Sequence, residues 1–473
     1  MAFSVIVAQT LQGGIGLDGT LPWRIKEDMQ HFKHLTTNNI VIMGKKTYLS
    51  IPEKNRPLVN RINIVLSRHE CKEANVYHAT SFQHALDIAF KMANEKQIFV
   101  MGGVAVYAAA LVHPHCKKLF VTQLLATNIH CDTFMPSICH KKFQIVDAGP
   151  VQIENNISYQ FLTYERRHEE YQYLELAREV LNAGVLKPNR TGMPAFSVFG
   201  RTQRYSLLGN RIPLLTTKKV FLKGIVEELL WFLRGSTDVQ ELQDRGVLIW
   251  NEDAARGDGE LGAIYSFQWR HWGADYVNCH ADYHGQGIDQ IQALIDKLKT
   301  DPNDRRLILS AWNVSDLKKM VLPPCHVLAQ FYVHDNKYLS CTMYQRSCDL
   351  ALGVPFNQAS YSLLTCLLAH HCGLEPYEFI HYLGDLHVYQ NQVDALLLQL
   401  QRVPQHEFPT VKLNYPAETP LDKLQSSDIL LENYFPQSKI KMELSTGLKL
   451  KANAITTTLK KNSAENNKKL RTE

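Results

Sequence analysis

Alternation of apolar strand-like runs with helical segments dominates the first third of the chain and limits its possible folds most strongly. Segments with helical spacing separate five runs rich in β-branched and aromatic residues: FSVIVAQ, IVIM, INIVLS, QIFVMGG and KLFVTQL. A later pair, FQIVDAG and ISYQFLTYERR, reads as two closing antiparallel strands. This order predicts an α/β unit with a mixed sheet flanked by helices.

A change of pattern near Arg166–Arg167 marks a predicted domain boundary. From HEEYQYLELAREVLNAG onward apolar residues recur at helical spacing, and Gly184 suits the end of that helix. A chain of 473 residues is long enough for two cores. We predict two domains, residues 1–166 and 167–444, followed by a basic tail, 445–473. The tail is rich in Lys, Asn and Thr and is expected to be disordered.

The charge distribution argues against a protein that binds nucleic acid. The net charge is +5, and seven cations and two anions in the tail account for all of it. The remaining body is formally neutral and has no general attraction for a phosphate backbone.

The chain also has the character of a cytoplasmic protein. MAFSVIVAQTLQGG lacks the basic start of a signal peptide, and the longest apolar run, SYSLLTCLLAHHCGL, is too short and polar to span a bilayer. Its ten cysteines follow no framework spacing, so we expect free thiols and no membrane partner. Adjacent His370, His371 and Cys372 end an apolar helix without a second ligand pair, which favours a core role over a metal site.

The segment LPWRIKEDMQHFKHLT places a carboxylate on an apolar stripe. If it is helical, Asp28 shares a face with Ile25, Phe32 and Leu35. A carboxylate held there should have a raised pKa. The alternative is an acid at a helix start, stabilised by the helix dipole.

Three strand ends nearby carry groups suited to phosphate. VIMGKKT places Gly44, two lysines and a threonine after an apolar strand. IVLSR places Arg68 at the end of another strand, which suits the extra phosphate of NADP. FVMGG ends a third strand with a glycine pair, where the backbone can approach a ligand closely.

Together these segments resemble the dihydrofolate reductase family over nearly all of residues 1–166. The carrying motifs are VIVAQTLQGGIGLDGTLPW, VIMGKKT, SIPEKNRPL, INIVLSR, FVMGG, VTQ and CDTFMP. The resemblance implies NADPH-dependent reduction of dihydrofolate, with Asp28 as the acid that assists protonation of the pterin ring. It also implies a cis Gly102–Gly103 peptide. The implied folate contacts are Ala8, Phe32, Ile51, Arg61 and Thr122; the implied NADPH contacts are Ala8, Ile15, Gly44, Lys45, Lys46, Thr47, Ser67, Arg68, Gly102 and Gly103.

In the second domain, MVLPPCHVLAQFYV sets Cys325 behind two prolines and before an apolar strand-like run. A nucleophilic sulfur needs a fixed position beside groups that favour the thiolate. A buried structural cysteine is the alternative. Four arginines stand in polar breaks next to apolar segments, where they could bind a dianion or simply face water: Arg190, Arg305, Arg306 and Arg346.

The stretch from Arg167 to Leu444 resembles the thymidylate synthase family, an α+β fold. The carrying motifs are NRTG, PLLTTKKVFLKGIVEELLWFLRGST, YSFQWRHWGA, DRRLILSAWN, LPPCH, YQRSCDLALGVPFN, LGDLHVY and IKMEL. The resemblance implies that Cys325 attacks C6 of deoxyuridylate (dUMP), so that C5 can accept a one-carbon unit from 5,10-methylenetetrahydrofolate. It also implies a homodimer through this domain, because Arg305 and Arg306 would serve the partner's site.

The same resemblance implies roles for further residues. Glu228 and Tyr265 would organise water and proton transfer, and Asn357 would contact the uracil edge. Trp250 and Asp349 would contact folate. The implied dUMP contacts are Arg190, Arg305, Arg306, His326, Gln345, Arg346, Ser347, Asp349, Asn357, His387 and Tyr389.

The chain departs from the synthase pattern near the site and at its end. Cys348 and Ala351 stand where the family commonly has glycines, and Ser266 replaces the usual glycine after Tyr265. In addition, 29 residues follow Leu444, where family chains usually end and fold over the ligands. A free terminal carboxylate therefore cannot close this site in the usual way.

We predict one chain with both activities, using NADPH and 5,10-methylenetetrahydrofolate and no metal. One alternative is an enzyme of the same fold for another pyrimidine, such as a deoxycytidylate hydroxymethylase. Asn357 argues against it, because an acid would pair better with the amino donor of cytosine. The other alternative is an inactive scaffold or RNA-binding protein, which would not need the thiol, four arginines and Asp28 together.

Overall fold

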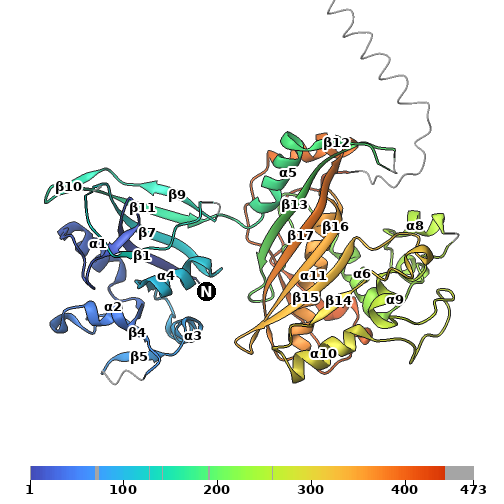
Figure 1. Cartoon of the computed structure of the whole chain (residues 1–473), viewed down its shortest axis with the longest axis horizontal. Coiled ribbons are helices and arrows are strands. Elements are labelled where there is room, and N and C mark those ends of the chain that lie inside the picture. The colour runs from blue at the N-terminus through green and yellow to red at the C-terminus, as the bar shows by residue number, and fades with distance from the viewer. Residues whose placement is uncertain are drawn as a thin grey trace, which may run out of the picture. The chain divides into compact units, whose positions relative to one another are not determined.

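The computed structural model describes most of the chain (Figure 1). The described residues are 2–69, 74–126, 128–140, 142–189, 192–257 and 259–442. The chain divides between His168 and Glu169 into two compact units. The tail predicted for 445–473 lies outside the described residues.

The first unit is an α/β structure, as predicted. Its strands are β1 (Phe3–Thr10), β2 (Gly14–Gly16), β3 (Ile40–Gly44), β4 (Ile62–Leu66), β5 (Val76–Ala79), β6 (Ile98–Val100), β7 (Cys116–Leu124), β8 (Thr133–Phe134), β9 (Phe143–Ala148), β10 (Gln152–Glu154) and β11 (Ile157–Arg166). Its helices are α1 (Lys26–Thr36), α2 (Lys45–Ser50), the 3-10 turn η1 (Glu53–Asn55), α3 (Phe82–Met92) and α4 (Val104–Val112).

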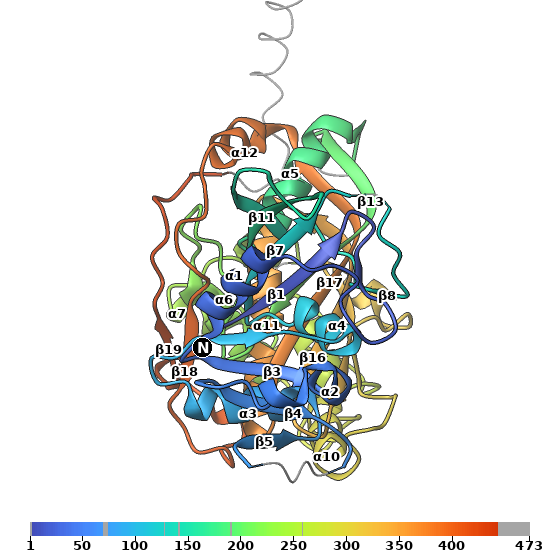
Figure 2. The same cartoon turned by 90° about the vertical axis from the view of Figure 1, so that its left-hand side faces the viewer.

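The main sheet of this unit has the strand order β10-β11-β7-β1-β6-β3-β4-β5 (Figure 2). The pairs from β7 to β5 are parallel. β11 runs antiparallel to β7 and also pairs with β9, which confirms the expected closing antiparallel pair. The carboxyl ends of β3, β4 and β6 therefore meet along one edge, where ligands of open α/β sheets bind.

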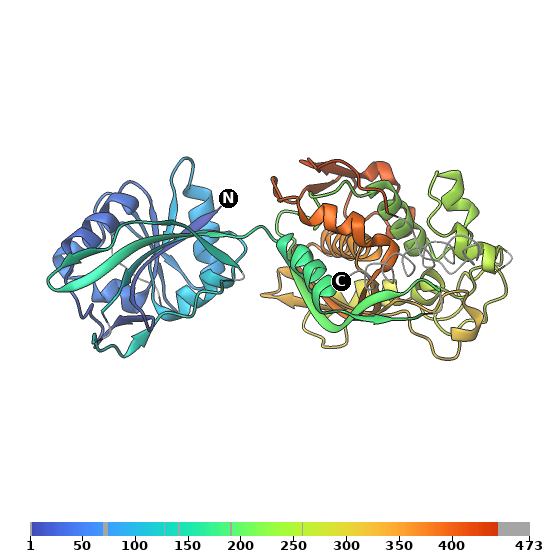
Figure 3. The same ribbon diagram turned by 90° about the horizontal axis from the view of Figure 1, so that it is seen from above.

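Residues of β3 alternate between two apolar layers, which explains why helices flank the sheet (Figure 3). Ile40 and Ile42 pack in the cluster that contains α3 and α4, whereas Val41 and Met43 pack in the cluster beside α1 and α2. All four are fully buried. Burying each such side chain stabilises the fold by about 2 kcal/mol.

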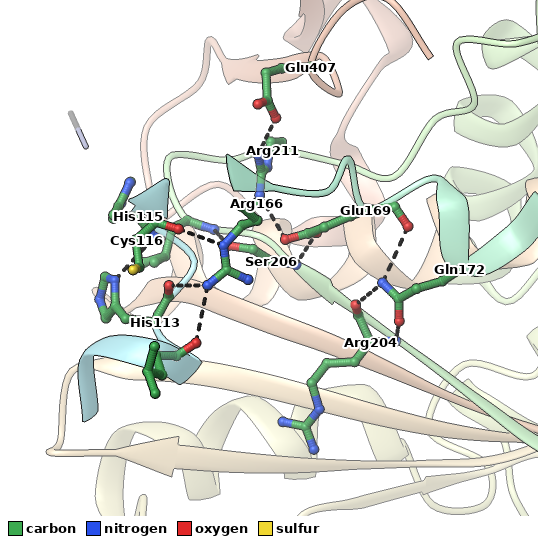
Figure 4. A network of polar contacts seen from close by, with 12 residues as sticks. His113, His115, Cys116, Arg166, Glu169, Gln172, Arg204, Ser206, Arg211 and Glu407 are labelled. Carbon is green, nitrogen blue, oxygen red and sulfur yellow. Dashed lines mark hydrogen bonds and ion pairs between the residues drawn. The ribbon is translucent and has the colours of Figure 1, made fainter. Parts of the chain in front are cut away.

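Each unit holds its own end of the junction by internal contacts (Figure 4). In the first unit, the Arg166 guanidinium donates to the carbonyls of Cys116 and His113, both at 2.7 Å, beyond the end of α4. In the second unit, Glu169 accepts from Ser206 N at 2.9 Å and pairs with Arg211 at 3.2 Å. These contacts order the chain up to the junction on both sides.

The second unit combines a large sheet with helices, as the α+β prediction required. Its helices are α5 (Tyr171–Ala183), α6 (Leu222–Arg234), α7 (Gln240–Asp244), α8 (Asn251–Arg256), α9 (Tyr265–Arg270), α10 (Gln290–Thr300), η2 (Leu317–Lys319), α11 (Gly353–His371), η3 (Gln390–Gln392), α12 (Val393–Leu400), η4 (Leu421–Lys423) and η5 (Ser426–Asp428). Its strands are β12 (Val185–Lys187), β13 (Ala195–Ser206), β14 (Ile308–Ser310), β15 (His326–His334), β16 (Tyr338–Asp349), β17 (Glu375–Tyr389), β18 (Thr410–Leu413) and β19 (Ile429–Glu432).

The sheet of this unit has the order β12-β13-β17-β16-β15-β14, and α11 lies along it (Figure 1). α11 packs against β16, β17 and α6 and is buried nearly all round, as a central helix must be. β16 and β17 are parallel, and their register sets Ser347 opposite Asp385 and Asp349 opposite His387. This pairing collects residues from YQRSCD and LGDLHVY at one end of the sheet.

Candidate active sites

Asp28 of the first unit is a buried acid with one strong partner. It is 8% exposed, on the face of α1 that packs on the sheet. Thr122 Oγ1, from β7, donates to Asp28 Oδ1 at 2.6 Å. Burial raises the pKa of Asp28, and the Thr122 bond offsets part of that rise because it favours the charged form. The raised pKa expected from the apolar stripe is confirmed, and the carboxyl group can carry a proton closer to neutral pH.

A cavity of 1620 Å³ opens beside Asp28. Cavities for single small ligands are typically about 300–1,000 Å³, so this one has room for two. Apart from Thr122, which backs Asp28, all residues of the first unit that are predicted to bind folate or NADPH line it, together with Asp28: Ala8, Ile15, Phe32, Gly44, Lys45, Lys46, Thr47, Ile51, Arg61, Ser67, Arg68, Gly102 and Gly103.

Other lining residues were missed by the sequence analysis. They include Met29, Lys33, Leu58, Val59, Leu66, Thr80, Val104 and Tyr107. Leu58 belongs to the quoted SIPEKNRPL motif, and Leu66 stands beside a predicted strand end. Proximity to those signals could have identified these two.

Arg61 is a preorganised cation in this cavity. Its Nε donates to Thr36 Oγ1 and its Nη1 to the Val59 carbonyl, both at 2.8 Å, and its guanidinium lies 5.7 Å from the Phe32 ring centre. In the described part of the chain, no carboxylate forms an ion pair with Arg61. A guanidinium held this way suits a ligand carboxylate.

The glycines of this cavity leave little space for side chains and keep the backbone exposed to a ligand. Gly44 N donates to the Gly102 carbonyl at 2.7 Å, and the Gly102–Gly103 peptide is cis, as the resemblance implied. Gly102 has a φ of 123°, and a Cβ on Gly103 would lie 3.1 Å from Thr47 Oγ1. The backbone here can approach a ligand closely, with Lys46 and Arg68 lining the same cavity.

Cys325 of the second unit stands immediately before β15 and is partly exposed. Its backbone N–H donates to the Tyr265 hydroxyl at 2.6 Å, and its carbonyl accepts from Arg346 N at 2.9 Å. These two hydrogen bonds and the start of β15 fix the backbone position of Cys325.

The Arg346 guanidinium lies beside the same loop. It donates to the carbonyls of Pro323 and Pro324 at 2.7 and 2.8 Å and stacks over Trp312, 5.4 Å from the ring centre. A fixed cation near a cysteine favours its thiolate form. The antiparallel pairing of β15 and β16 thus brings together two predicted residues, Cys325 and Arg346.

Glu228 on α6, like Asp28, is a buried acid with a raised pKa. Burial raises the pKa of Glu228 to about 7, although a hydrogen bond from Trp250 works in the opposite direction. Trp250 Nε1 donates to Glu228 Oε1 at 2.8 Å. A carboxyl group with a pKa near 7 can both donate and accept a proton at neutral pH.

Asn357 on α11 belongs to a cluster of hydrogen-bonded side chains that includes Gln345 of β16. Gln345 Nε2 donates to Asn357 Oδ1 at 2.9 Å, and His326 hydrogen bonds to the same side chain. Burial lowers the pKa of His326 to about 4, so the ring is neutral near pH 7. The Asn357 amide is therefore oriented before any ligand arrives.

His387 and Asp349 face each other on the parallel strands. Burial acts to lower the pKa of His387, but bonds to Asp385 and the charge of Asp349 outweigh it, so the pKa is raised. Tyr389 lies with its ring centre 5.2 Å from that of His387, and Ser347 stands on the neighbouring strand.

Comparison with known proteins accounts for both units. Residues 2–166 match the dihydrofolate reductase family, and residues 171–446 match the thymidylate synthase family. The bifunctional dihydrofolate reductase-thymidylate synthase of Zea mays is 43% identical, covering 94% of this chain and 96% of that protein. The chain belongs to the bifunctional dihydrofolate reductase–thymidylate synthase family.

Relatives with the same bifunctional description occur in distant organisms. That of Paramecium tetraurelia is 42% identical, with 94% of this chain and 98% of the relative covered. That of Leishmania major is 42% identical, with 94% and 95% covered. The family thus accounts for the order of the two units as well as for each unit.

Among the predicted phosphate-binding arginines of the synthase unit, only Arg346 is described beside Cys325. Arg305 and Arg306 are exposed just before β14; Arg306 is 81% exposed and binds Asp304 at 2.9 Å. Arg190 lies outside the described residues. Among the described residues, neither Arg305 nor Arg306 forms a hydrogen bond or ion pair with a predicted residue of the synthase site.

The three departures from the synthase pattern are buried. Cys348, Ala351 and Ser266 are each 0% exposed. The Ala351 carbonyl accepts a hydrogen bond from Lys218, and Cys348 Sγ lies 3.2 Å from the Gln345 carbonyl. These side chains fill space inside the unit, next to residues of the site.

None of the described helices is both long enough and apolar enough to cross a membrane. Within the same residues, no group of three or more His, Cys, Asp or Glu side chains is arranged to hold a metal ion. His370 and His371 instead end α11, and His370 hydrogen bonds to the Tyr415 carbonyl at 3.0 Å.

Proposed function

We propose that the chain carries out two consecutive reactions. The synthase unit converts dUMP and 5,10-methylenetetrahydrofolate into dTMP and dihydrofolate. The reductase unit converts dihydrofolate, NADPH and a proton into tetrahydrofolate and NADP⁺. The observation that carries this proposal is the presence of two separate sites, one around Asp28 and one around Cys325, each within its own unit.

In the synthase site, Cys325 is the nucleophile. Its thiolate forms a bond to C6 of dUMP, which makes C5 nucleophilic toward the one-carbon unit. Arg346 favours the thiolate and contributes to phosphate binding. Glu228, which accepts a hydrogen bond from Trp250, exchanges protons at the base. Asn357 contacts the uracil edge, while His387 and Tyr389 hold the sugar hydroxyl.

In the reductase site, Asp28 holds and supplies the proton needed at the pterin ring. Arg61 binds the glutamate carboxylate of the folate, and Phe32 and Ile51 pack against its rings. The fit of a dinucleotide is supported by the glycine cradle at Gly102–Gly103. NADPH supplies the hydride when bound, and Lys46, Thr47, Ser67 and Arg68 would hold its phosphates.

We further propose a homodimer formed through the synthase sheet. The outward face of this sheet carries a cross-strand row of Thr202, Tyr382, Tyr344 and Leu328. Tyr382 and Tyr344 are 47% and 39% exposed, and Phe199 on the same sheet is 72% exposed. Exposed apolar residues grouped on one sheet face favour a partner surface. Because a symmetric dimer uses the same face twice, Arg305 and Arg306 would reach the site of the partner.

Spectrophotometric assays of the purified full chain test these proposals. Dihydrofolate should form when dUMP and 5,10-methylenetetrahydrofolate are supplied, and NADPH should be consumed when dihydrofolate is supplied. Absence of either reaction in folded protein would remove that half of the proposal. Sedimentation tests the dimer. We also propose a cytoplasmic location on the sequence grounds given above, which cell fractionation tests.

A further inference from the structure

A buried line of side chains lies behind Asn357. His381 on β17 and Gln345 on β16 are 0% and 2% exposed. His381 Nε2 lies 2.8 Å from Gln345 Oε1, and Gln345 Nε2 lies 2.9 Å from Asn357 Oδ1. We call these three residues the amide relay.

A backbone carbonyl fixes the direction of the amide relay. Gln345 Nε2 also lies 3.0 Å from the Ser347 carbonyl oxygen, which can only accept. The amide nitrogen of Gln345 must therefore face Ser347, and its oxygen must face His381. An oxygen can only accept, so His381 must carry its proton on Nε2.

The protonation state of His381 agrees with this direction. Burial lowers the pKa of His381 to about 3, with a smaller contribution from His326, so the ring is neutral at pH 7. In the tautomer with a proton on Nε2, Nδ1 carries only a lone pair. Nδ1 has no hydrogen-bond partner among the described residues, and an unpaired lone pair costs less than an unpaired N–H.

The direction of the relay determines which atom of the Asn357 amide is left to face a ligand. Because Gln345 donates to Asn357 Oδ1, the Asn357 amide oxygen is turned toward Gln345, and Nδ2 is left as a donor. The 4-oxo group of uracil accepts a hydrogen bond, whereas the 4-amino group of cytosine donates one. Reversing Asn357 to suit cytosine would place two N–H groups against each other at Gln345.

We propose that His381 is a positioning residue for base selection, which holds Gln345 and through it Asn357 in the orientation that favours a 4-oxo over a 4-amino pyrimidine. This inference rests on the proposed binding of dUMP at Asn357. Part of the discrimination between dUMP and dCMP then depends on His381, a residue that does not touch the substrate.

The test measures binding of dUMP and of dCMP to the full chain by calorimetry. His381→Leu removes the donor to Gln345 Oε1 and should reduce the ratio Kd(dCMP)/Kd(dUMP) roughly tenfold. A change of that size corresponds to the free energy of about one hydrogen bond. His381→Gln keeps a donor near the Nε2 position and should restore the ratio to within roughly threefold of wild type. The matched control is His334→Leu, because His334 Nε2 also binds a side chain, Ser340 at 2.8 Å, on another strand of the same sheet.

Three outcomes separate the possibilities. An unchanged ratio in folded His381→Leu, or an equal fall in His334→Leu, would overturn the positioning role and leave the proposed function intact. Failure of the wild-type chain to bind dUMP would overturn the proposed function instead. If His381→Leu does not fold, ¹⁵N NMR of the wild-type histidine decides. A proton on Nε2 is expected, and a proton on Nδ1 contradicts the relay.

Discussion

Thr122 Oγ1 donates a 2.6 Å hydrogen bond to Asp28 Oδ1 inside the reductase unit. The bond stabilises the ionised carboxylate, whereas burial stabilises the neutral acid, and burial is the larger effect. The pKa of Asp28 is therefore raised, but less than burial alone would raise it. Thr122 thus sets the pH at which the reductase acid loses its proton.

The pH profile of the reductase should follow this balance. The role proposed for Asp28 is that of an acid, so kcat/KM should fall as pH rises through its pKa. Thr122→Val removes the bond that favours the charged form, and the fall should move to higher pH by up to roughly one unit. Steady-state rates with dihydrofolate and NADPH between pH 5 and 9 measure the shift.

Asp28→Asn is the companion variant for this profile. It should lower kcat/KM by roughly 100-fold or more at neutral pH and abolish the titration. Synthase activity should stay the same in both variants. A Thr122→Val profile displaced to lower pH would show that the bond acts in the opposite sense.

Glu228 should make the synthase unit less stable as pH rises. Its folded-state pKa of about 7 lies above its ordinary value of 4.5, so the fold prefers the protonated group. That contribution is complete below about pH 4.5 and is lost as pH rises through about 7. Glu228→Gln cannot ionise, so its unfolding free energy relative to wild type should increase by up to about 3 kcal/mol between pH 5 and 8. Urea unfolding at both pH values measures this, and a difference that is flat with pH would exclude the raised pKa.

Subunit mixing tests whether Arg305 and Arg306 serve the partner's site. A double Arg→Ala chain mixed with a Cys325→Ser chain should regain synthase activity, because one site of each mixed dimer then has neither defect. Random exchange should give about one quarter of the wild-type activity. No recovery after exchange confirmed by mass labelling would place these arginines in the site of their own chain.

The end of the chain should divide into a necessary and a dispensable part. Lys218 Nζ lies 3.4 Å from Met442 Sδ and bonds to the Ala351 carbonyl, so the last described residues pack beside the synthase site. Deleting 440–444 should therefore damage synthase turnover. Truncation after Leu444 should leave both activities near wild type at physiological salt, with effects on substrate capture that appear only at low salt. A large loss of turnover on truncation at ordinary salt would show that the extension is needed at the synthase site.

Local sequence patterns were sufficient to predict some of these features. The apolar stripe around Asp28 predicted its burial and raised pKa, because helical periodicity fixes which residues share a face. The alternation of strands and helices predicted the first sheet, because strands joined through helices form a largely parallel sheet. The strand ends bearing Gly44 and Arg68 predicted the cavity edge, since parallel strands end at a common edge.

Other features depend on contacts that no local pattern encodes. The bond between Cys325 and Tyr265 joins residues 60 positions apart, and only the packing of α9 against the sheet brings them together. The amide relay needs the parallel register of β16 and β17, which nothing in either strand specifies alone. No local pattern around His381 in the sequence signals this contact.

Cys325→Ser tests most directly whether one chain contains two chemically independent sites. Both activities should be assayed on the same purified variant, with its circular dichroism spectrum compared with that of wild type. We expect synthase turnover to fall by roughly 10³-fold or more, because the serine hydroxyl is a far weaker nucleophile, while dihydrofolate reduction stays within roughly twofold of wild type. Loss of both activities in a folded variant, or retention of dTMP formation, would contradict the account.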